Sequence, residues 1–302
     1  MSSLSIGIST YSDKLLENLL KVIGENDIGS RIKIHTVRES DWNRITCRVK
    51  LPLSTGRNKK QALKNIKAGL SSILAGVIMS HFEEKLLSRI INSSYCYFSP
   101  RERNEILGIA LRLIKAADDQ GPQSSSPLAS RKEIIERNIE KYLETSKEVL
   151  LEGFVNFRIK EYLRELEEIA DMAVDEFLVQ REYLEFIRLL RYFVDIQEPK
   201  LELIHIIIGF NNKYIILNND GKEVTNQCIR EFAVEKTIEE INQEDLLISS
   251  LITLAPLRIY LHITGQVKNK EIIETIKSVF WGKVIICTGC ALCKANMANI
   301  KP

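Results

Sequence analysis

The last third of the chain contains the stretch that decides how the C-terminal region folds. It reads "LRIYLHIT" (257–264), "NKEIIETIKSVF" (269–280) and "KVIICTG" (283–289). The first and third segments have the short apolar patterns of strands, whereas apolar residues recur at helical spacing in the second. Strand, helix and strand within about 30 residues indicate a βαβ unit. Its right-handed crossover makes the two strands parallel neighbours.

This unit predicts where three closely spaced cysteines lie. Cys287, Cys290 and Cys293 form "CTGCALC" at the end of the second strand, and His262 lies near the end of the first. Both strand ends reach the same sheet edge, where ligands bind in open α/β sheets. Three thiolates and one imidazole are a known zinc ligand set. An iron–sulfur cluster is the other cofactor considered, although the fourth cysteine and following proline of that pattern are absent.

Two other interpretations of these residues stay open. A C-x-x-C pair can perform thiol–disulfide chemistry, which would make the protein a thiol- or metal-dependent enzyme or a redox sensor. Alternatively, Cys287 is a small buried strand residue and the other two cysteines are free thiols. His262 and His205 are each also consistent with a hydrogen-bonded histidine in the core.

A small α/β unit is predicted for residues 1–53. "LSIGIST", "RIKIHTV" and "RITCRVKL" alternate as strands do, and the last two are separated by a hairpin turn. Between the first two strands, leucines at helical spacing predict a helix with Ser12 as its N-cap and Gly24 as its stop.

The middle of the chain is predicted to be helical. Residues 54–117 and 131–199 carry apolar stripes at helical spacing, and the Gly-, Pro- and Ser-rich residues 118–130 between them indicate a linker. Ser99 and Glu102 have the spacing of a capping box around Pro100.

Two details of the second helical region can be tested against the structure. Its first stripe continues through Val149 and Leu150, with Gly153 as a possible break. The segment 183–196, "YLEFIRLLRYFVDI", is apolar on two sides and is therefore expected to be central and buried.

Residues 200–302 form the C-terminal α/β region. Segments 201–210 and 213–218 are strands of a hairpin, residues 225–255 are mostly helical, and the βαβ unit and cysteines follow. The predicted fold class is therefore α/β of the α-rich α+β kind, with a helical middle, an N-terminal α/β unit and a C-terminal mixed sheet.

Composition excludes few functions. The formal net charge is +2, which supplies no overall attraction to nucleic acid or anionic lipid. The N-terminus lacks the pattern of a signal peptide. The longest apolar run, 68–80, is shorter than the roughly 20 residues that span a bilayer, so we expect no transmembrane segment. The expected location is the cytoplasm, where thiols stay reduced.

A basic helix is a separate candidate surface. Arg57, Lys60, Lys64 and Lys67 lie beside an apolar stripe, so the segment 57–78 could bind an anionic surface as part of a peripheral membrane protein. It is equally consistent with the solvated face of a bundle helix. Aromatic residues do not alternate with the lysines, which gives no clear signal for nucleic acid. No complete catalytic motif is present, and no residue is assigned as catalytic.

Long segments of the chain resemble the YtxC-like sporulation proteins of endospore-forming bacteria. The similar segments are 81–107, 152–208, 244–263 and the closing "FWGKVIICTGCALC" (280–293). The resemblance implies a sporulation-associated protein and supplies no catalytic residues. We therefore expect a non-enzymatic protein that binds or assembles with protein partners, with a metal stabilising its C-terminal edge.

Overall fold

The computed structural model describes nine ranges of the 302-residue chain. These are residues 3–9, 12–26, 29–39, 41–49, 57–119, 131–209, 214–224, 243–263 and 270–294. The chain divides into two compact units, Met1–Leu178 and Val179–Pro302, and the division falls within one long helix. The predicted α-rich α+β class is confirmed, because helices predominate and each unit contains a small mixed sheet.

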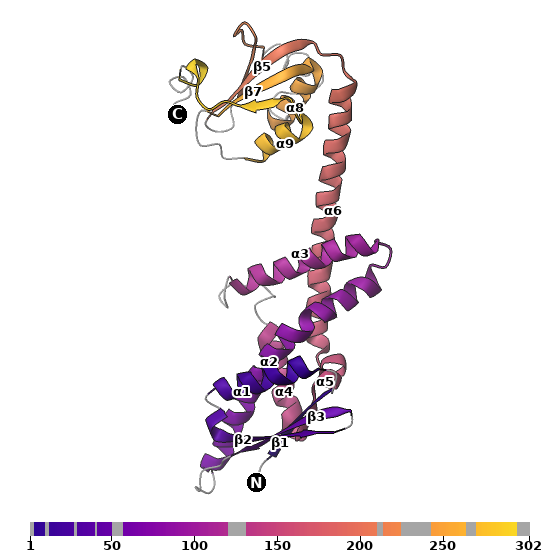
Figure 1. The fold of residues 1–302 in the computed structure, drawn as a ribbon, viewed down its shortest axis with the longest axis vertical. Coiled ribbons are helices and arrows are strands. Elements are labelled where there is room, and N and C mark those ends of the chain that lie inside the picture. The colour runs from indigo at the N-terminus through magenta and orange to yellow at the C-terminus, as the bar shows by residue number, and fades with distance from the viewer. Residues whose placement is uncertain are drawn as a thin grey trace. The chain divides into compact units, whose positions relative to one another are not determined.

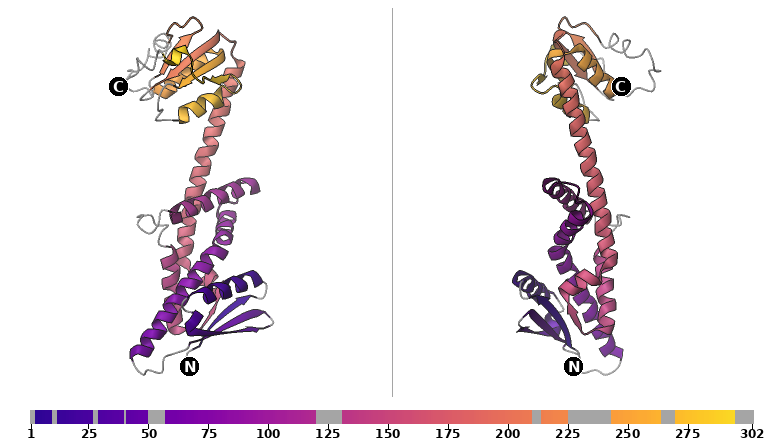
Figure 2. Two further views of the ribbon diagram at one scale, coloured as in Figure 1. Left: turned by 60° about the vertical axis from the view of Figure 1, so that its left-hand side comes forward. Right: turned by 90° about the vertical axis from the view of Figure 1, so that its right-hand side faces the viewer.

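The first unit begins with a four-stranded sheet, β2-β3-β1-β4. Its elements are β1 (Ser3–Ser9), α1 (Asp13–Glu25), the 3-10 turn Gly29–Arg31, β2 (Ile32–Arg38), β3 (Trp42–Val49) and β4 (Glu148–Leu150). Strands β2 and β3 pair antiparallel, which confirms the predicted hairpin, and β1 pairs antiparallel with the other edge of β3. Figure 2 shows α1 lying across the strands. The helix runs past Gly24 to Glu25, so the predicted stop is wrong by one residue.

Strand β4 corrects the predicted helical stripe. Val149 and Leu150 belong to this short strand, which pairs parallel with β1 through Ile6↔Val149 and Gly7↔Leu150. The backbone hydrogen bonds offered by the free edge of β1 outweigh the local helical pattern. Gly153 then lies inside the next helix and does not end one.

Helices complete the first unit (Figure 1). They are α2 (Arg57–Ser94), α3 (Pro100–Asp119), α4 (Arg131–Thr145), α5 (Leu151–Phe157) and the first half of α6 (Lys160–Ile196). The capping box at the start of α3 is confirmed. The Ser99 backbone N–H donates to Glu102 Oε2 at 2.7 Å, and the Glu102 N–H donates to Ser99 Oγ at 3.3 Å.

Four polar residues meet inside the helices of the first unit, and we name them the arginine cluster. Arg131 is fully buried and pairs with Glu83 at 3.2 Å and with Asp118. The Tyr162 hydroxyl donates to Glu83 Oε1 at 2.8 Å. Burial raises the pKa of Glu83, and Arg131 and the Tyr162 hydrogen bond oppose that rise. The cluster connects α2, α3, α4 and α6.

The second unit contains the sheet β6-β5-β7-β8. Its elements are the second half of α6, β5 (Leu201–Ile208), β6 (Tyr214–Asn218), α8 (Gln243–Leu254), β7 (Pro256–Ile263), α9 (Glu271–Val279) and β8 (Val284–Ile286). The predicted hairpin is confirmed by antiparallel β5–β6 pairing. The predicted βαβ unit is confirmed by parallel β7–β8 pairing around α9.

One core holds the second unit together. Alternate residues of β5 and β7, such as Ile206 and Leu261, are fully buried in it, together with residues of α8 and α9 such as Leu251 and Ile276. Helix α6 contributes Ile187 and Val194. All three helices therefore pack against the sheet face that carries these strand residues.

The expectation that the segment 183–196 is buried on two sides is wrong. Ile187 and Val194 are buried, but much of the other apolar surface of this half of α6 is exposed. The exposed residues are Tyr183, Leu184, Phe186, Leu189, Tyr192, Phe193 and Ile196. The physical reason is that this half of α6 meets the core of the second unit along a single face.

Some predicted segments lie outside the described residues. Asp118 and Asp119 of the predicted linker end α3, whereas residues 120–130 are outside the described ranges. The same holds for 211–212, the predicted hairpin turn, and for 225–242, which is most of a predicted helical segment.

Candidate functional site

The two parallel strands of the βαβ unit position the ends of the candidate site. His262 is the second-last residue of β7, and Cys287 directly follows β8. The Cys287 N–H donates to Leu261 O at 2.9 Å, which extends the β7–β8 hydrogen bonding by one residue. As predicted, the ends of these strands bring Cys287 and His262 to one edge of the sheet.

A tight turn returns the other two cysteines to that edge. Gly289 has φ +127°, a conformation that side-chain-bearing residues rarely adopt, and its N–H donates to Cys287 Sγ at 3.4 Å. A short helical turn follows, closed by a hydrogen bond of 3.2 Å from Lys294 N–H to Cys290 O. The glycine therefore permits the reversal that places Cys290 and Cys293 beside Cys287.

The four predicted ligands converge, and we name them the Cys/His cluster. Their ligand atoms all lie within 4.8 Å of one another. Cys293 Sγ is 3.7 Å from Cys287 Sγ and 3.8 Å from Cys290 Sγ. His262 Nδ1 is 3.3 Å from Cys293 Sγ and 3.5 Å from Cys290 Sγ.

These separations match those of a single tetrahedral ion. With Zn–S bonds of about 2.3 Å and Zn–N bonds of about 2.0 Å, neighbouring sulfurs lie about 3.8 Å apart and sulfur and nitrogen about 3.5 Å apart. The donor set, three thiols and one imidazole nitrogen, is one that zinc uses in structural sites. The residues present therefore fit a zinc ion by both chemistry and spacing.

The surroundings favour the ligand forms of two of these groups. Burial lowers the pKa of His262, which keeps the ring neutral. The pKa of Cys290 is also lowered, chiefly by a hydrogen bond from the Cys293 backbone to its sulfur. Burial instead raises the pKa of Cys293. A cation would have to offset that rise, since the thiolate is the ligand.

A second histidine lies within hydrogen-bond distance of the first. His205 on β5 faces His262 across the sheet, with His205 Nδ1 3.0 Å from His262 Nε2. If His262 Nε2–H donates this hydrogen bond, Nδ1 presents its lone pair to the cysteines. Sequence reasoning gave His205 no such role, because no sequence signal indicated which strand lies beside β7.

The basic residues of α2 lie elsewhere, in the first unit. Lys60 and Lys64 are exposed, and Lys67 is half-buried with its Nζ donating to Leu143 O at 2.6 Å. That contact is at the C-terminal end of α4, where a cation is favourable. The side chain of Arg57 lies outside the described part of the chain.

The apolar stripe of α2 is already used by the fold. Leu70, Leu74 and Val77 belong to the core of the first unit. By length and composition alone, Lys60–Ser94 could cross a membrane, and 44% of its most apolar stretch is buried within the protein. The core helix of a globular unit meets the same criteria, so this is weak evidence for a membrane span.

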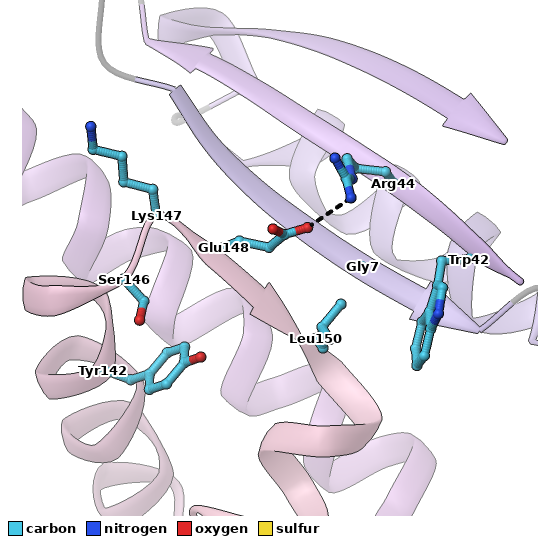
Figure 3. Close-up of a pocket in the computed structure, with 8 residues that line it drawn as sticks. All are labelled: Gly7, Trp42, Arg44, Tyr142, Ser146, Lys147, Glu148 and Leu150. Carbon is cyan, nitrogen blue, oxygen red and sulfur yellow. Dashed lines mark ion pairs between the residues drawn. The ribbon is translucent and has the colours of Figure 1, made fainter. Parts of the chain in front are cut away.

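A surface pocket with a volume of about 510 Å³ in the first unit is a second candidate for the functional site (Figure 3). Arg44 lines it and pairs with Glu148 at 3.3 Å and with Glu39 at 3.4 Å, so its charge is matched internally. A Cβ at Gly7 would lie 2.5 Å from the Leu150 side chain, which explains the glycine by the close approach of β4. We therefore keep the Cys/His cluster as the candidate site.

Comparison with known families decides which family the chain belongs to. The model of the YtxC-like family matches residues 68–285. The chain belongs to the YtxC-like family. The matched region of this YtxC-like protein includes His205 and His262 and ends two residues before Cys287.

A relative supports the same conclusion. The chain is 25% identical over 272 residues to the uncharacterized protein YtxC of Bacillus subtilis (strain 168). The aligned region covers 88% of this chain and 93% of the relative. No solved structure matches the chain. The family resemblance is thus confirmed, and the site must be interpreted from its own geometry.

Proposed function

We propose that this YtxC-like protein is a non-enzymatic, zinc-stabilised binding or assembly protein of the cytoplasm, associated with sporulation. The observation that carries the proposal is the convergence of four metal-ligand atoms within 4.8 Å of one another. The association with sporulation rests on the family resemblance, and the cytoplasmic location rests on the need for reduced thiols.

The ligand count supports a structural role for the ion. His262, Cys287, Cys290 and Cys293 would occupy all four positions of a tetrahedron. Catalytic zinc sites commonly keep one position for water or substrate. A closed site therefore supports a protein that binds or assembles and does not hydrolyse a substrate.

The size of the cluster favours one ion over an iron–sulfur cluster. Sulfur atoms 3.7 and 3.8 Å apart leave room for a single metal between them. An iron–sulfur cluster contains several irons and sulfides and commonly uses four cysteines, whereas the described part of the chain brings three to this site.

The ion would fasten a weakly held edge. Strand β8 is three residues long and forms one side of the sheet, so it has few hydrogen bonds of its own. An ion bound by Cys287, Cys290 and Cys293 and also by His262 on β7 would hold the segment after β8 against β7. Metal binding of this kind contributes directly to folding free energy.

Metal analysis tests this proposal. The full chain, purified anaerobically without added chelator, should contain about one equivalent of zinc. Cobalt substitution should produce the intense visible bands of tetrahedral thiolate coordination. Cys290→Ser should reduce bound metal and these bands, whereas Cys96→Ser, at an exposed cysteine of the first unit, should leave them unchanged. Less than about 0.1 equivalent of any metal would contradict the proposal.

Thiol chemistry is the second candidate function. Cys293 Sγ lies near two other sulfurs, and the pKa of Cys290 is lowered, as in reactive thiol pairs. A redox role would give metal-free protein in which mild oxidation forms a disulfide within the cluster and a thiol reductant reverses it. Peptide mapping of the oxidised and reduced protein separates this outcome from the zinc site.

A further inference from the structure

An apolar groove of about 750 Å³ lies in the second unit, between α6, α8 and α9. Ile248 and Ile272 are buried residues at its base. Val179 and Phe186 line its α6 side and are 66% and 54% exposed. A group of large apolar side chains with this much solvent exposure is typical of an interaction surface.

The groove is held in shape by polar contacts between α6 and α9. The Tyr183 hydroxyl and Thr275 Oγ1 are 3.0 Å apart. Farther along the same helices, Arg191 donates to Ser278 O at 3.1 Å and 2.6 Å. A binding partner would therefore meet a largely preformed surface, which lowers the entropic cost of association.

The residues on the α6 side have the spacing of a helix-packing seam. Val179, Tyr183, Phe186 and Leu190 all line the groove, and their steps are four, three and four residues. Apolar residues at this spacing form the seam along which a second helix packs in a coiled coil. The geometry therefore favours an α-helix lying along α6.

Charge narrows the choice of partner. Glu244, Asp245, Glu271 and Glu274 line the groove together with a single lysine, Lys270. Asp245, Glu271 and Glu274 are exposed, and Glu274 also pairs with Lys277 at 2.8 Å. The described lining residues that reach solvent are therefore acidic in excess, even with Lys270 and Lys277 counted. A positively charged partner would be attracted to this surface.

We propose that this groove binds an amphipathic helix of a protein partner, with apolar residues on one side and Lys or Arg on the other. The proposal names a partner class for the binding role proposed above, and it uses a surface separate from the Cys/His cluster. A second copy of the chain is a poorer occupant, because a two-fold interface through this groove would bring two surfaces of the same negative charge together.

Binding of two designed peptides to the full chain tests this inference. Both are 18-residue amphipathic helices with the same leucine face, and one carries lysines where the other carries glutamates. We expect the lysine peptide to bind with at least tenfold higher affinity than the glutamate peptide, measured by fluorescence anisotropy. Its affinity should fall as the salt concentration rises. Phe186→Ser should reduce its affinity about tenfold or more, as for an interface anchor.

Two matched variants locate the binding surface. Tyr192→Ser changes an exposed aromatic residue of α6 that does not line the groove, and it should leave affinity unchanged. Glu274→Lys should lower the affinity for the lysine peptide and raise the affinity for the glutamate peptide. Equal binding of both peptides, or loss of binding in Tyr192→Ser but not in Phe186→Ser, would overturn the proposal.

Two further measurements keep the outcomes separate. Sedimentation of the peptide-free chain that shows a dimer broken by Phe186→Ser would identify a second copy as the occupant and overturn the proposal. Zinc content measured in the same samples separates the two proposals. Protein that contains zinc but does not bind the lysine peptide would contradict the proposed helix-binding groove and would leave the zinc proposal unaffected.

Discussion

Each unit holds one cluster of polar side chains, and the two clusters differ in composition. In the arginine cluster of the first unit, the cation Arg131 meets Glu83 and Asp118, and Tyr162 donates to Glu83. The opposite charges are therefore paired within the protein, although Arg131 Nε and Nη1 have no hydrogen-bond partner among the described residues. In the Cys/His cluster of the second unit, three thiols and one imidazole direct sulfur and nitrogen atoms at one another.

The difference indicates what each cluster requires. Arg131 and Glu83 can stay charged together, because each offsets the burial cost of the other. Thiolates cannot offset one another, so Cys287, Cys290 and Cys293 need either protons or a bound cation. The charges of the first cluster are matched as folded, whereas the second cluster has the donor set of a metal site.

The largest expected effect tests the need for a cation. Cys293→Ser should lose bound metal and unfold the second unit at a lower urea concentration, since structural zinc contributes roughly 10 kcal/mol in small zinc domains. Hydrogen exchange at the Cys287 N–H, which bonds to Leu261 O, reports the change locally. Unchanged exchange and unchanged stability would show that the cluster needs no ion.

Removing the cation of the first cluster should have the next largest effect. Arg131→Met leaves Glu83 buried without its charged partner and should lower the free energy of unfolding by about 3–5 kcal/mol. The double variant Arg131→Met/Glu83→Gln should recover most of that loss, because the neutral amide leaves no buried charge and its oxygen can still accept from the Tyr162 hydroxyl. Urea unfolding measures both, and a double variant as unstable as the single one would contradict a self-paired cluster.

A smaller effect is expected at the histidine behind the metal site. His205→Phe removes the acceptor for His262 Nε2–H and should weaken zinc affinity by about 10- to 100-fold while leaving one zinc bound at saturation. Competition with a chromophoric chelator measures the affinity. His35→Phe, at an exposed histidine of β2, is the control and should have no effect. Equal affinities in all three proteins would remove His205 from the site.

The smallest effect sets the scale for a polar contact at the surface. Ser99→Ala breaks one bond of the capping box and should lower the free energy of unfolding of the first unit by about 1 kcal/mol. Ser94→Ala, at an exposed serine that ends α2, should change it by less than about 0.5 kcal/mol. If Ser99→Ala lowered the free energy of unfolding as much as Arg131→Met, buried and surface polar contacts would not differ in their contribution to stability.

Much of the candidate site could be predicted because it depends on local order. Alternation and helical spacing defined the βαβ unit, and the three-residue steps from Cys287 to Cys293 keep the thiols within reach of one another. His262 followed from the rule that parallel strands of such a unit end at one edge. His205 did not follow, because it reaches the site through β5 and lies 57 residues before His262 in the chain.

The sequence by itself determined the local elements: the strands and helices of both α/β regions, the capping box at Ser99 and the ligand set at the end of the chain. Tertiary structure alone decided that β4 joins the first sheet, that α6 leaves apolar residues exposed beside the apolar groove, and that His205 lies against His262. Periodicity records which side of an element is apolar. Which neighbour covers that side depends on the packing of segments distant in sequence, and no local pattern encodes it.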